Sequence, residues 1–229
     1  MKYLFFLLLA LAGLFTACSG STADSKNPYV AYFYPVDSIP KIYLYRDVAN
    51  GLDEQFHRIY AVKDAEGEHV IVEIYSADGR ILEALNYNLD SLDIMDHMVV
   101  NRKGEKTKAE LFKYKLMPMN DSEETYFASR FQGFLDSTLI LKEIRRKVSS
   151  DEISHDVMGE EVTAIKMTDK IRMSSFNPFA KRDNTIQTRS VNYFAKGFGL
   201  VEYHSMDKSV HYKLEKVLSQ EEWLKLVTR

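Results

Sequence analysis

Apolar and polar residues alternate with a period of two through most of the chain that follows Pro28. Because successive side chains of a β-strand point to opposite faces, this alternation predicts strands that bury one face. Turns such as Asn50-Gly51 and Asp78-Gly79 separate the alternating runs, and these dipeptides favour tight β-hairpin loops. Parallel strands would need crossovers of about a dozen residues or more, so the short connections predict antiparallel pairing.

The pattern predicts about ten strands. The runs cover residues 42–48, 56–62, 70–74, 81–87, 98–101, 109–116, 139–148, 163–173, 186–195, 198–206 and 209–217. The run at 139–148 fits a helical face nearly as well, but the turn at Met158-Gly159 and the alternation beyond it favour a long hairpin. Residues 88–97 are predicted to form a loop or a short helical turn, and residues 174–184 a loop. Ser122-Glu123-Glu124 suits the start of a short helix.

The last predicted element is a helix that begins after Ser219. Glu222 stands three residues beyond Ser219, the spacing of a reciprocal capping box, and an apolar face follows. About ten strands exceed what a flat sheet usually carries without curling. We therefore expect a mainly β fold, a curved antiparallel sheet (half-barrel or sandwich-like) with a short C-terminal helix. Its concave side must be filled by a helix, by loops or by something else.

The N-terminal segment predicts the cellular compartment in which the protein resides. Lys2 supplies a positive charge, and Tyr3–Leu14 form an apolar run of about a dozen residues, as in a secretory signal peptide. A membrane-spanning helix needs roughly 20 such residues, which disfavours a retained span. The segment Leu14-Phe15-Thr16-Ala17-Cys18 resembles a bacterial lipobox. The resemblance implies cleavage before Cys18 and a diacylglyceryl group on its thiol; the alternative is an ordinary signal peptide with a stray cysteine near the cut.

Removal of the predicted signal peptide, residues 1–17, leaves 212 of the 229 residues. Residues 18–27 are small and polar and are predicted to form a flexible tether. Residues 28–229 are predicted to form one domain, since no Pro/Gly-rich linker divides them. Ser19, and not aspartate, follows Cys18. By analogy with lipoprotein sorting, we expect a lipid anchor in the outer membrane, with the periplasmic face favoured over the cell surface.

Composition narrows the functional classes. The formal charge of −3 becomes −4 once Lys2 is lost, so no strong field attracts nucleic acid. Apolar residues make up 45% of the chain, which argues against disorder. Cys18 is the only cysteine, so an intramolecular disulfide is excluded. The 14 tyrosines and 13 phenylalanines suit half-buried sheet surfaces.

No motif for catalysis or cofactor binding is present. The chain lacks H-E-x-x-H, a Cys/His cluster and G-x-S-x-G, so we predict no catalytic residue, no metal and no cofactor. Two weaker metal candidates are His204 with His211 across a hairpin, and a Ca²⁺ loop formed by Asp90, Asp93, Asp96 and His97. Surface histidines and a solvated turn are the favoured interpretations, because the loop lacks the glycine and the last glutamate of an EF-hand.

Charged runs are interpreted as surface features. Arg145-Arg146-Lys147 is predicted to lie on an exposed strand edge, where cations discourage aggregation. The acid pairs Glu123-Glu124 and Glu160-Glu161 are placed at turns, and Glu221-Glu222 at the helix start, where the helix dipole favours them. The spacing of Gly197 and Gly199 indicates a bend in a strand. It is not a nucleotide site, since no third glycine and no helix follow.

The stretch Val191–Tyr203 resembles a strand found near the end of several uncharacterised bacterial envelope lipoprotein families. The matching residues are Tyr193, Ala195, Gly197, Gly199, Leu200 and Val201. Upstream, residues 159–166 are similar to the hairpin that precedes this strand in those families. These families resemble the curved half-barrels of the LolA/LolB lipoprotein carriers. The resemblance implies a curved sheet and an envelope location, and it brings no catalytic residues.

These observations favour a non-enzymatic cell-envelope lipoprotein that binds an apolar or amphipathic ligand on its curved sheet. A lipid, a lipidated partner and a hydrophobic peptide are the candidate ligands, and the acyl anchor is the expected membrane contact. One alternative is a structural or accessory subunit of an outer-membrane complex that pairs through exposed strand edges. Another is an enzyme on envelope glycans, with two facing carboxylates. Cys18 is the one site residue that the sequence identifies; the ligand-binding residues stay open.

Overall fold

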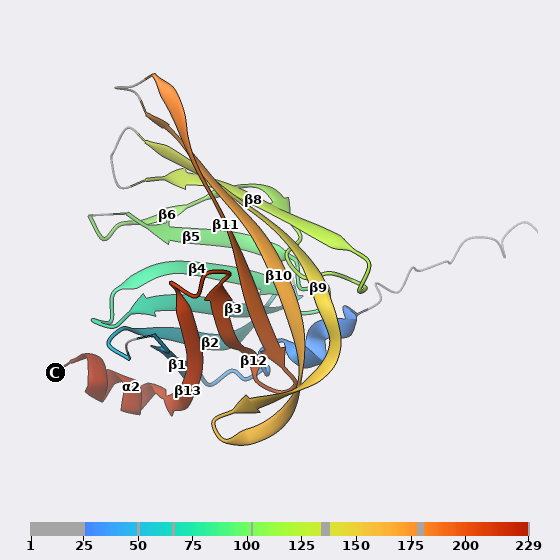
Figure 1. Cartoon of the computed structure of the whole chain (residues 1–229). Helices are drawn as coiled ribbons and strands as arrows, with labels where there is room; N and C mark the ends of the chain where they lie inside the picture. The colour runs from blue at the N-terminus through green and yellow to red at the C-terminus, as the bar shows by residue number, and fades with distance from the viewer. Residues whose placement is uncertain are drawn as a thin grey trace, which may run out of the picture.

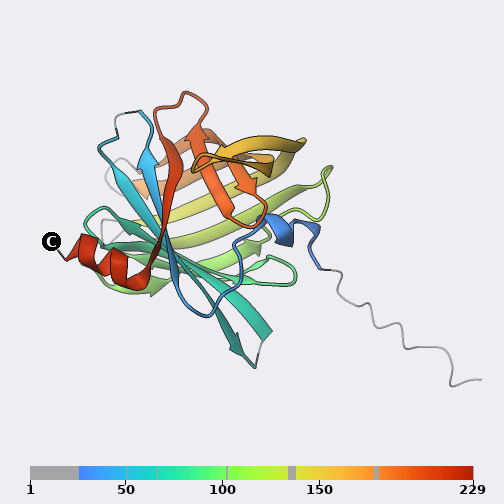
Figure 2. The ribbon, with the colours of Figure 1, turned by 90° about the horizontal axis from the view of Figure 1, so that it is seen from below.

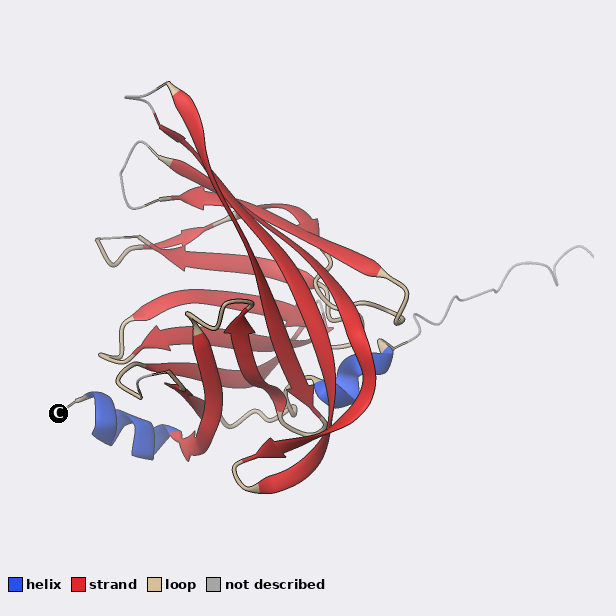
Figure 3. Ribbon diagram, in the orientation of Figure 1, coloured by secondary structure: helices blue, strands red, loops and turns tan. Residues whose placement is uncertain are grey.

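The computed structural model describes residues 26–49, 51–65, 67–101, 103–133, 138–177 and 181–228. Within these ranges, 13 strands form a single antiparallel sheet, preceded by a 3-10 helix η1 (Pro28–Tyr32) and followed by α2 (Gln220–Val227) (Figure 1). The predicted class, a curved antiparallel sheet with a short C-terminal helix, is confirmed (Figure 3). The strands are β1 Lys41–Asp47, β2 Glu54–Asp64, β3 Gly67–Ser76, β4 Ile81–Asn88, β5 Ile94–Val100, β6 Lys106–Lys108, β7 Glu110–Tyr114, β8 Glu124–Gln132, β9 Leu139–Val157, β10 Glu160–Asn177, β11 Arg182–Ala195, β12 Gly199–Ser205 and β13 His211–Ser219.

The sheet curves until its two outermost strands nearly meet. The strand order is β6-β5-β4-β3-β2-β1-β13-β12-β11-β10-β9-β8-β7, and Ala109 alone separates β6 from β7 in the chain. The Ala109 N–H donates to the His97 carbonyl at 2.8 Å, and Asp93 forms an isolated bridge with Lys115. The sequence places strands at residues 98–101 and 109–116 as neighbours along the chain, but the partner of β5 is the short β6, which lies between them. The strand predicted at residues 109–116 corresponds to β7, which pairs with β8 and not with β5.

Strand β1 is buried on both faces, which explains its nearly continuous apolar run. Tyr43 and Tyr45 belong to the main core inside the curve, whereas Ile42 and Leu44 belong to a second cluster on the outer face. Helix α2 covers this second cluster through Trp223. Figure 2 shows α2 and η1 on opposite sides of the sheet. The capping box predicted at Ser219 and Glu222 is confirmed.

No helix in the ranges given above is long and apolar enough to cross a membrane.

The N-terminal segment closes one end of the curved sheet. Asn27, which the sequence assigned to the tether, is 2% exposed and caps η1 by accepting a hydrogen bond from the Tyr29 N–H. Its side-chain amide donates to the carbonyls of Ser91 (3.1 Å) and Pro118 (3.0 Å). Because these carbonyls belong to the β4–β5 and β7–β8 connections, η1 is attached to the turns at this end. Asn27 is therefore part of the packed domain.

Gly199 allows the N-terminal segment to pack closely on the sheet. Its φ is +88°, and a Cβ at this position would lie 2.4 Å from Cδ1 of Tyr34. The register between β11 and β12 shifts between Tyr193 and Phe194. The bend predicted from the two glycines of this stretch is thus present, and its function is to receive a buried tyrosine.

Three sequence predictions about loops and helices are wrong. Residues 88–97 include the start of β5, Ser122-Glu123-Glu124 leads into β8, and residues 174–184 belong largely to β10 and β11. In β5 and β8 some inward positions are polar, among them His97, Thr125 and Ser129, so the apolar alternation is broken. The prediction of a loop at residues 174–184 is wrong for another reason. Residues 182–189 are exposed on both faces, so no apolar period marks them.

The run Arg145-Arg146-Lys147 does not lie on a strand edge. It belongs to β9, which pairs with β8 on one side and β10 on the other. Arg146 points into the curve and is 7% exposed. Its guanidinium forms a two-pronged ion pair with Asp169, with Nε–Oδ1 at 2.7 Å and Nη2–Oδ2 at 2.8 Å. The charge of Arg146 is tolerated inside the fold because Asp169 of the neighbouring strand neutralises it.

Candidate functional site

A cavity of about 530 Å³ lies inside the curved sheet. Most of its lining is apolar, and it includes Val72, Ile74, Leu85, Phe131, Ile144 and Phe194. Its volume falls in the range of about 300–1,000 Å³ that small-molecule sites occupy. Leu82 lines the cavity and is 41% exposed, so the cavity reaches solvent beside the β3–β4 turn.

The opposite end of the cavity is closed by aromatic side chains that follow η1. Phe33 and Tyr34 line it there, and the Phe33 ring packs edge-on against Tyr87 with centroids 4.9 Å apart. Tyr34 packs edge-on against Tyr43 at 5.5 Å. The mouth beside Leu82 is therefore at the end of the cavity away from η1.

A charged cluster stands on the cavity wall near the mouth. Glu83 on β4 accepts hydrogen bonds from the Lys142 ammonium on β9 and from His97 Nε2 on β5, both at 3.1 Å. Burial by itself would raise the pKa of Glu83, but the positive charge of Lys142 and the hydrogen bond from His97 outweigh it. The pKa of Glu83 therefore lies well below its ordinary value. At neutral pH the wall carries a fixed pair of opposite charges.

A neutral polar group stands on the same wall, on β2, where His57 lies opposite Ile74 and Ile74 lies opposite Glu83. His57 is 4% exposed, and burial lowers its pKa to about 3, so its imidazole is uncharged at physiological pH. Its Nε2 lies 3.0 Å from Oε1 of Gln55, which also accepts a hydrogen bond from the Tyr203 hydroxyl at 2.6 Å. This group offers hydrogen bonding to a ligand without adding charge.

The polar wall includes a serine, an imidazole and a carboxylate in sequence. Ser129 Oγ lies 3.0 Å from His97 Nδ1, and His97 Nε2 lies 3.1 Å from Glu83. In a hydrolytic triad the serine must face the substrate carbonyl. Here Ser129 and His97 are both 0% exposed, and Ser129 is not among the residues that line the cavity. The arrangement supports the wall and presents no nucleophile to the cavity.

The charges around the cavity are balanced within the protein. Glu83 is neutralised by Lys142, and Asp169 by Arg146. An unpaired charge on a buried ligand would therefore have no free counterion among these residues, and burial of an unpaired charge is unfavourable. The cavity fits a ligand that is mainly apolar and that carries an uncharged or internally neutralised polar group.

The residues that the sequence singled out lie elsewhere. Cys18, the predicted lipidation site, is outside the described residues. The side chains of the candidate calcium loop do not converge on a common point. Asp90 pairs with Lys26, Asp96 pairs with Lys108, and His97 points inward to Glu83.

His204 and His211 do face each other on β12 and β13, as predicted, with ring centroids 5.3 Å apart. His211 Nε2 contacts Oε1 of Glu202 at 2.8 Å, and His155 Nε2 contacts the other carboxylate oxygen at 3.2 Å. Within the part of the chain that the structure describes, no three His, Cys, Asp or Glu side chains are placed to hold a metal ion. Glu202 is the shared contact of His155 and His211.

Two solved structures resemble this chain. One, described as a candidate lipoprotein from Parabacteroides distasonis, is 11% identical over 82% of this chain and 98% of its own, with a TM-score of 0.49. The other, described as a candidate exported protein with a YmcC-like fold from Bacteroides fragilis, is 13% identical over 82% of this chain and 99% of its own, with a TM-score of 0.43. No protein-family model and no curated protein sequence matches the chain. At these values the likeness assigns neither a ligand nor an activity, and the LolA/LolB resemblance stays a prediction.

Sequence reasoning did not find the polar wall: it named His97 only as a candidate calcium ligand and did not name Glu83 or Lys142. Glu83, His97 and Lys142 are separated by 14 and 59 positions along the chain, measured from Glu83, and share no motif. The only signal was a polar residue at an inward position of an otherwise apolar strand, as at Glu83 in β4. Without the register between strands, that signal cannot be distinguished from a local break in the pattern.

Proposed function

We propose that this chain is a non-enzymatic, lipid-anchored envelope protein whose cavity binds an apolar or amphipathic ligand. The observation that supports this proposal is the largely apolar cavity of about 530 Å³, which is open beside Leu82 and closed at the η1 end. The candidate ligands are an acyl chain of a lipid, the acyl group of a lipidated partner and an apolar peptide side chain. We favour the acyl chain because the walls carry no free charge.

The expected affinity follows from the buried surface. Each methylene moved from water into the cavity contributes about 0.8 kcal/mol, so ten methylenes contribute roughly 8 kcal/mol. Part of this is offset by the loss of translational and rotational freedom on association. The expected dissociation constant is therefore micromolar or weaker for a single chain, unless the polar wall adds hydrogen bonds.

Anchoring is the second part of the proposal. Cys18 would carry the acyl anchor, and the outer membrane with its periplasmic face is the proposed location. Labelled palmitate should enter the wild-type protein and should not enter the Cys18→Ser variant. Equal labelling of both proteins would remove the anchor from the proposal and would leave the cavity untouched.

The ligand is tested at the mouth of the cavity. Leu82→Trp places a larger side chain at the opening, whereas Leu52→Trp makes the same change at a site 86% exposed in the β1–β2 connection. The full-length protein, purified in detergent, would be extracted and its lipids identified by mass spectrometry. Binding of a fluorescent fatty-acid amide would be titrated in parallel.

We expect recovered lipid and saturable probe binding for the wild type and Leu52→Trp, and a loss of at least about tenfold in probe affinity for Leu82→Trp. Absence of extracted lipid together with unsaturable probe uptake by the wild type would refute ligand binding. Binding of the probe by Leu82→Trp with the affinity of the wild type would also refute ligand binding through this mouth.

A further inference from the structure

The first half of β11 has a free backbone edge. β10 pairs with β11 along its whole length, from Arg182 to Ala195, but β12 pairs with it only from Ser190 onward. On that side, residues 182–188 have no strand partner among the described residues, and all of them are exposed. Figure 1 shows this part of the β10–β11 hairpin extending beyond the neighbouring strands.

The backbone groups that face this edge can be assigned. The Met206 N–H donates to the Arg189 carbonyl at 3.0 Å, so the backbone of Arg189 points toward the β12 side. In a strand, alternate residues direct their N–H and C=O groups to the same side. Asp183, Thr185 and Gln187 therefore offer their N–H and C=O groups at the free edge. Such an edge is a template for an incoming strand.

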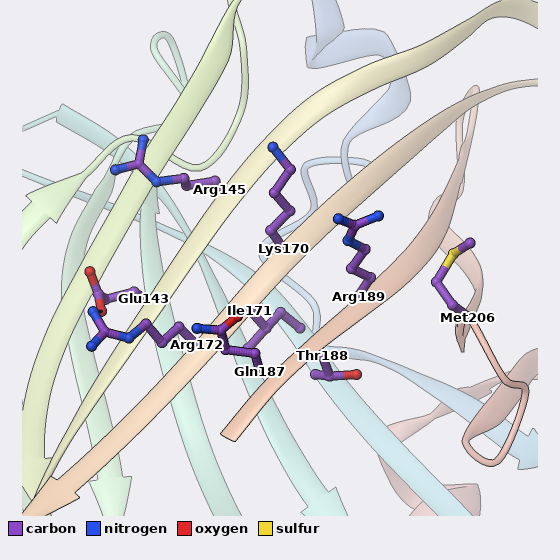
Figure 4. Close-up of a pocket in the computed structure, with 9 residues that line it drawn as sticks. All are labelled: Glu143, Arg145, Lys170, Ile171, Arg172, Gln187, Thr188, Arg189 and Met206. Atoms are coloured by element: carbon purple, nitrogen blue, oxygen red, sulfur yellow. Dashed lines mark hydrogen bonds and ion pairs between the residues drawn. The ribbon is translucent and has the colours of Figure 1, made fainter. Parts of the chain in front are cut away.

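A cationic groove runs beside the same edge. It has a volume of about 660 Å³ and lies on the outer face of β9, β10 and β11, where its lining includes Glu143, Arg145, Lys170, Arg172, Gln187 and Arg189 (Figure 4). Arg145 is directly opposite Lys170, and Lys170 is directly opposite Arg189. Like charges that face each other on neighbouring strands are destabilising. This row of three cations is therefore unfavourable in the isolated protein.

The carboxylates nearby neutralise only part of this charge. Glu124 contacts Lys170 at 3.0 Å and Arg145 at 3.8 Å. Glu143 contacts Arg172 at 3.1 Å. The two side chains lie next to each other in Figure 4. Arg189 forms no ion pair with a described residue. Of the row of three cations, Arg189 on β11 is thus the one available to an anionic partner.

The inner face of the β11 edge presents an apolar side chain. Ile186 is 69% exposed and lies opposite Met173, which lines the cavity. An incoming strand would place alternate side chains beside Ile186 and the others beside Gln187 and Arg189. The edge therefore matches a segment in which apolar and acidic residues alternate.

We propose that the β11 edge at residues 182–189 binds an extended segment of a partner protein in which acidic and apolar residues alternate. The partner strand would exchange backbone hydrogen bonds with the edge and would place a carboxylate against Arg189, and Lys170 on the next strand would add to the positive field there. Pairing of two copies through this edge is disfavoured, because it would bring their cationic rows together. This surface is independent of the proposed ligand cavity and gives the accessory-subunit alternative a defined location.

The test uses short blocked peptides labelled with fluorescein, with binding measured by anisotropy on the full-length protein in detergent at low ionic strength. One peptide alternates glutamate with valine, and the other alternates lysine with valine. Gln187→Pro removes an N–H from the edge, whereas Gln187→Ala keeps it; proline is tolerated where the N–H faces solvent. Lys170→Gln/Arg189→Gln removes two cations, and Lys216→Gln removes one from the exposed outer face of β13 as a control.

We expect the glutamate peptide to bind the wild type, Gln187→Ala and Lys216→Gln alike, and to bind Gln187→Pro and Lys170→Gln/Arg189→Gln at least about tenfold more weakly. Hydrogen exchange should slow at Thr185 and Gln187 when the peptide is bound. Melting temperatures of the variants show whether each one is folded.

Three results would overturn the proposal. They are no binding of the glutamate peptide to the wild type, equal binding of the lysine peptide, and normal binding of the glutamate peptide by a folded Gln187→Pro variant. The last result, combined with loss of binding in Lys170→Gln/Arg189→Gln, would mean that the groove attracts anions without strand pairing. A phosphate-rich ligand would then be the better occupant, which titration with tripolyphosphate would reveal.

Discussion

Replacement of Gly199 by alanine is expected to destabilise the fold where the N-terminal segment meets the sheet. The residue has φ +88°, and its added Cβ would lie 2.4 Å from Cδ1 and 2.8 Å from Cε1 of Tyr34. Tyr34 has little room to move, since it is 5% exposed and its ring packs against Phe33 and Tyr43. Two effects therefore add, the backbone conformation and the steric conflict.

Gly197 separates these two effects. Its φ is +77°, close to that of Gly199, but a Cβ there would meet nothing within 4 Å. Gly197→Ala should cost only the backbone conformation, about 1–2 kcal/mol. Gly199→Ala adds overpacking of a buried ring, about 1–3 kcal/mol, for a total loss of about 2–5 kcal/mol. The difference in free energy of unfolding between the two variants measures the cost of displacing the Tyr34 ring from its buried position.

The assay is urea unfolding of the full-length protein in detergent, followed by tryptophan fluorescence and analysed by linear extrapolation. Truncation of the ring should relieve the conflict, so Gly199→Ala/Tyr34→Ala should lose less free energy of unfolding than the sum of the single variants. Equal losses for Gly197→Ala and Gly199→Ala, or strict additivity in the double variant, would refute the reasoning that Tyr34 is the obstacle.

Two further predictions concern buried charges. Arg146→Met leaves Asp169 buried without its partner and should reduce the free energy of unfolding by about 3–5 kcal/mol in the same assay. A loss below about 1 kcal/mol, as for exposed pairs, would show that water reaches the carboxylate. Glu83 has a pKa below its ordinary value of 4.5 despite burial, because Lys142 and His97 favour the ionised form. Its contribution to stability is therefore complete above about pH 4.5 and declines as the pH falls toward the lowered pKa of the folded state. Thermal unfolding of Glu83→Gln should depend less on pH in this acidic range than that of the wild type, and parallel curves would contradict the assignment.

Local patterns predicted the strands that bury one face and are joined by exposed turns. Val70, Val72 and Ile74 of β3 show this alternation, and all three point into the curve. The capping box at the start of α2 is equally local, since Ser219 and Glu222 are three residues apart. Such features depend on neighbours within a few positions, and a sequence shows these directly.

The failures have a common cause in contacts between distant residues. Arg146 was interpreted as an exposed cation because its partner Asp169 lies 23 positions away and on another strand. Ser129 and His97 broke the apolar pattern of β8 and β5, yet they satisfy each other across 32 positions. A polar residue at an inward position is stable only when the register supplies a partner, and the register is set by the whole sheet.

By itself, the sequence determined the class of the fold, the antiparallel pairing and the C-terminal helix, because period, turn chemistry and capping act over short distances. Only the tertiary structure decided that β6 and β7 close the sheet, that the aromatic residues after η1 fill one end, and that the other end holds an open cavity. Those outcomes depend on which strands become neighbours and on how much space their side chains leave. Both are properties of the packed sheet as a whole, and no short segment encodes them.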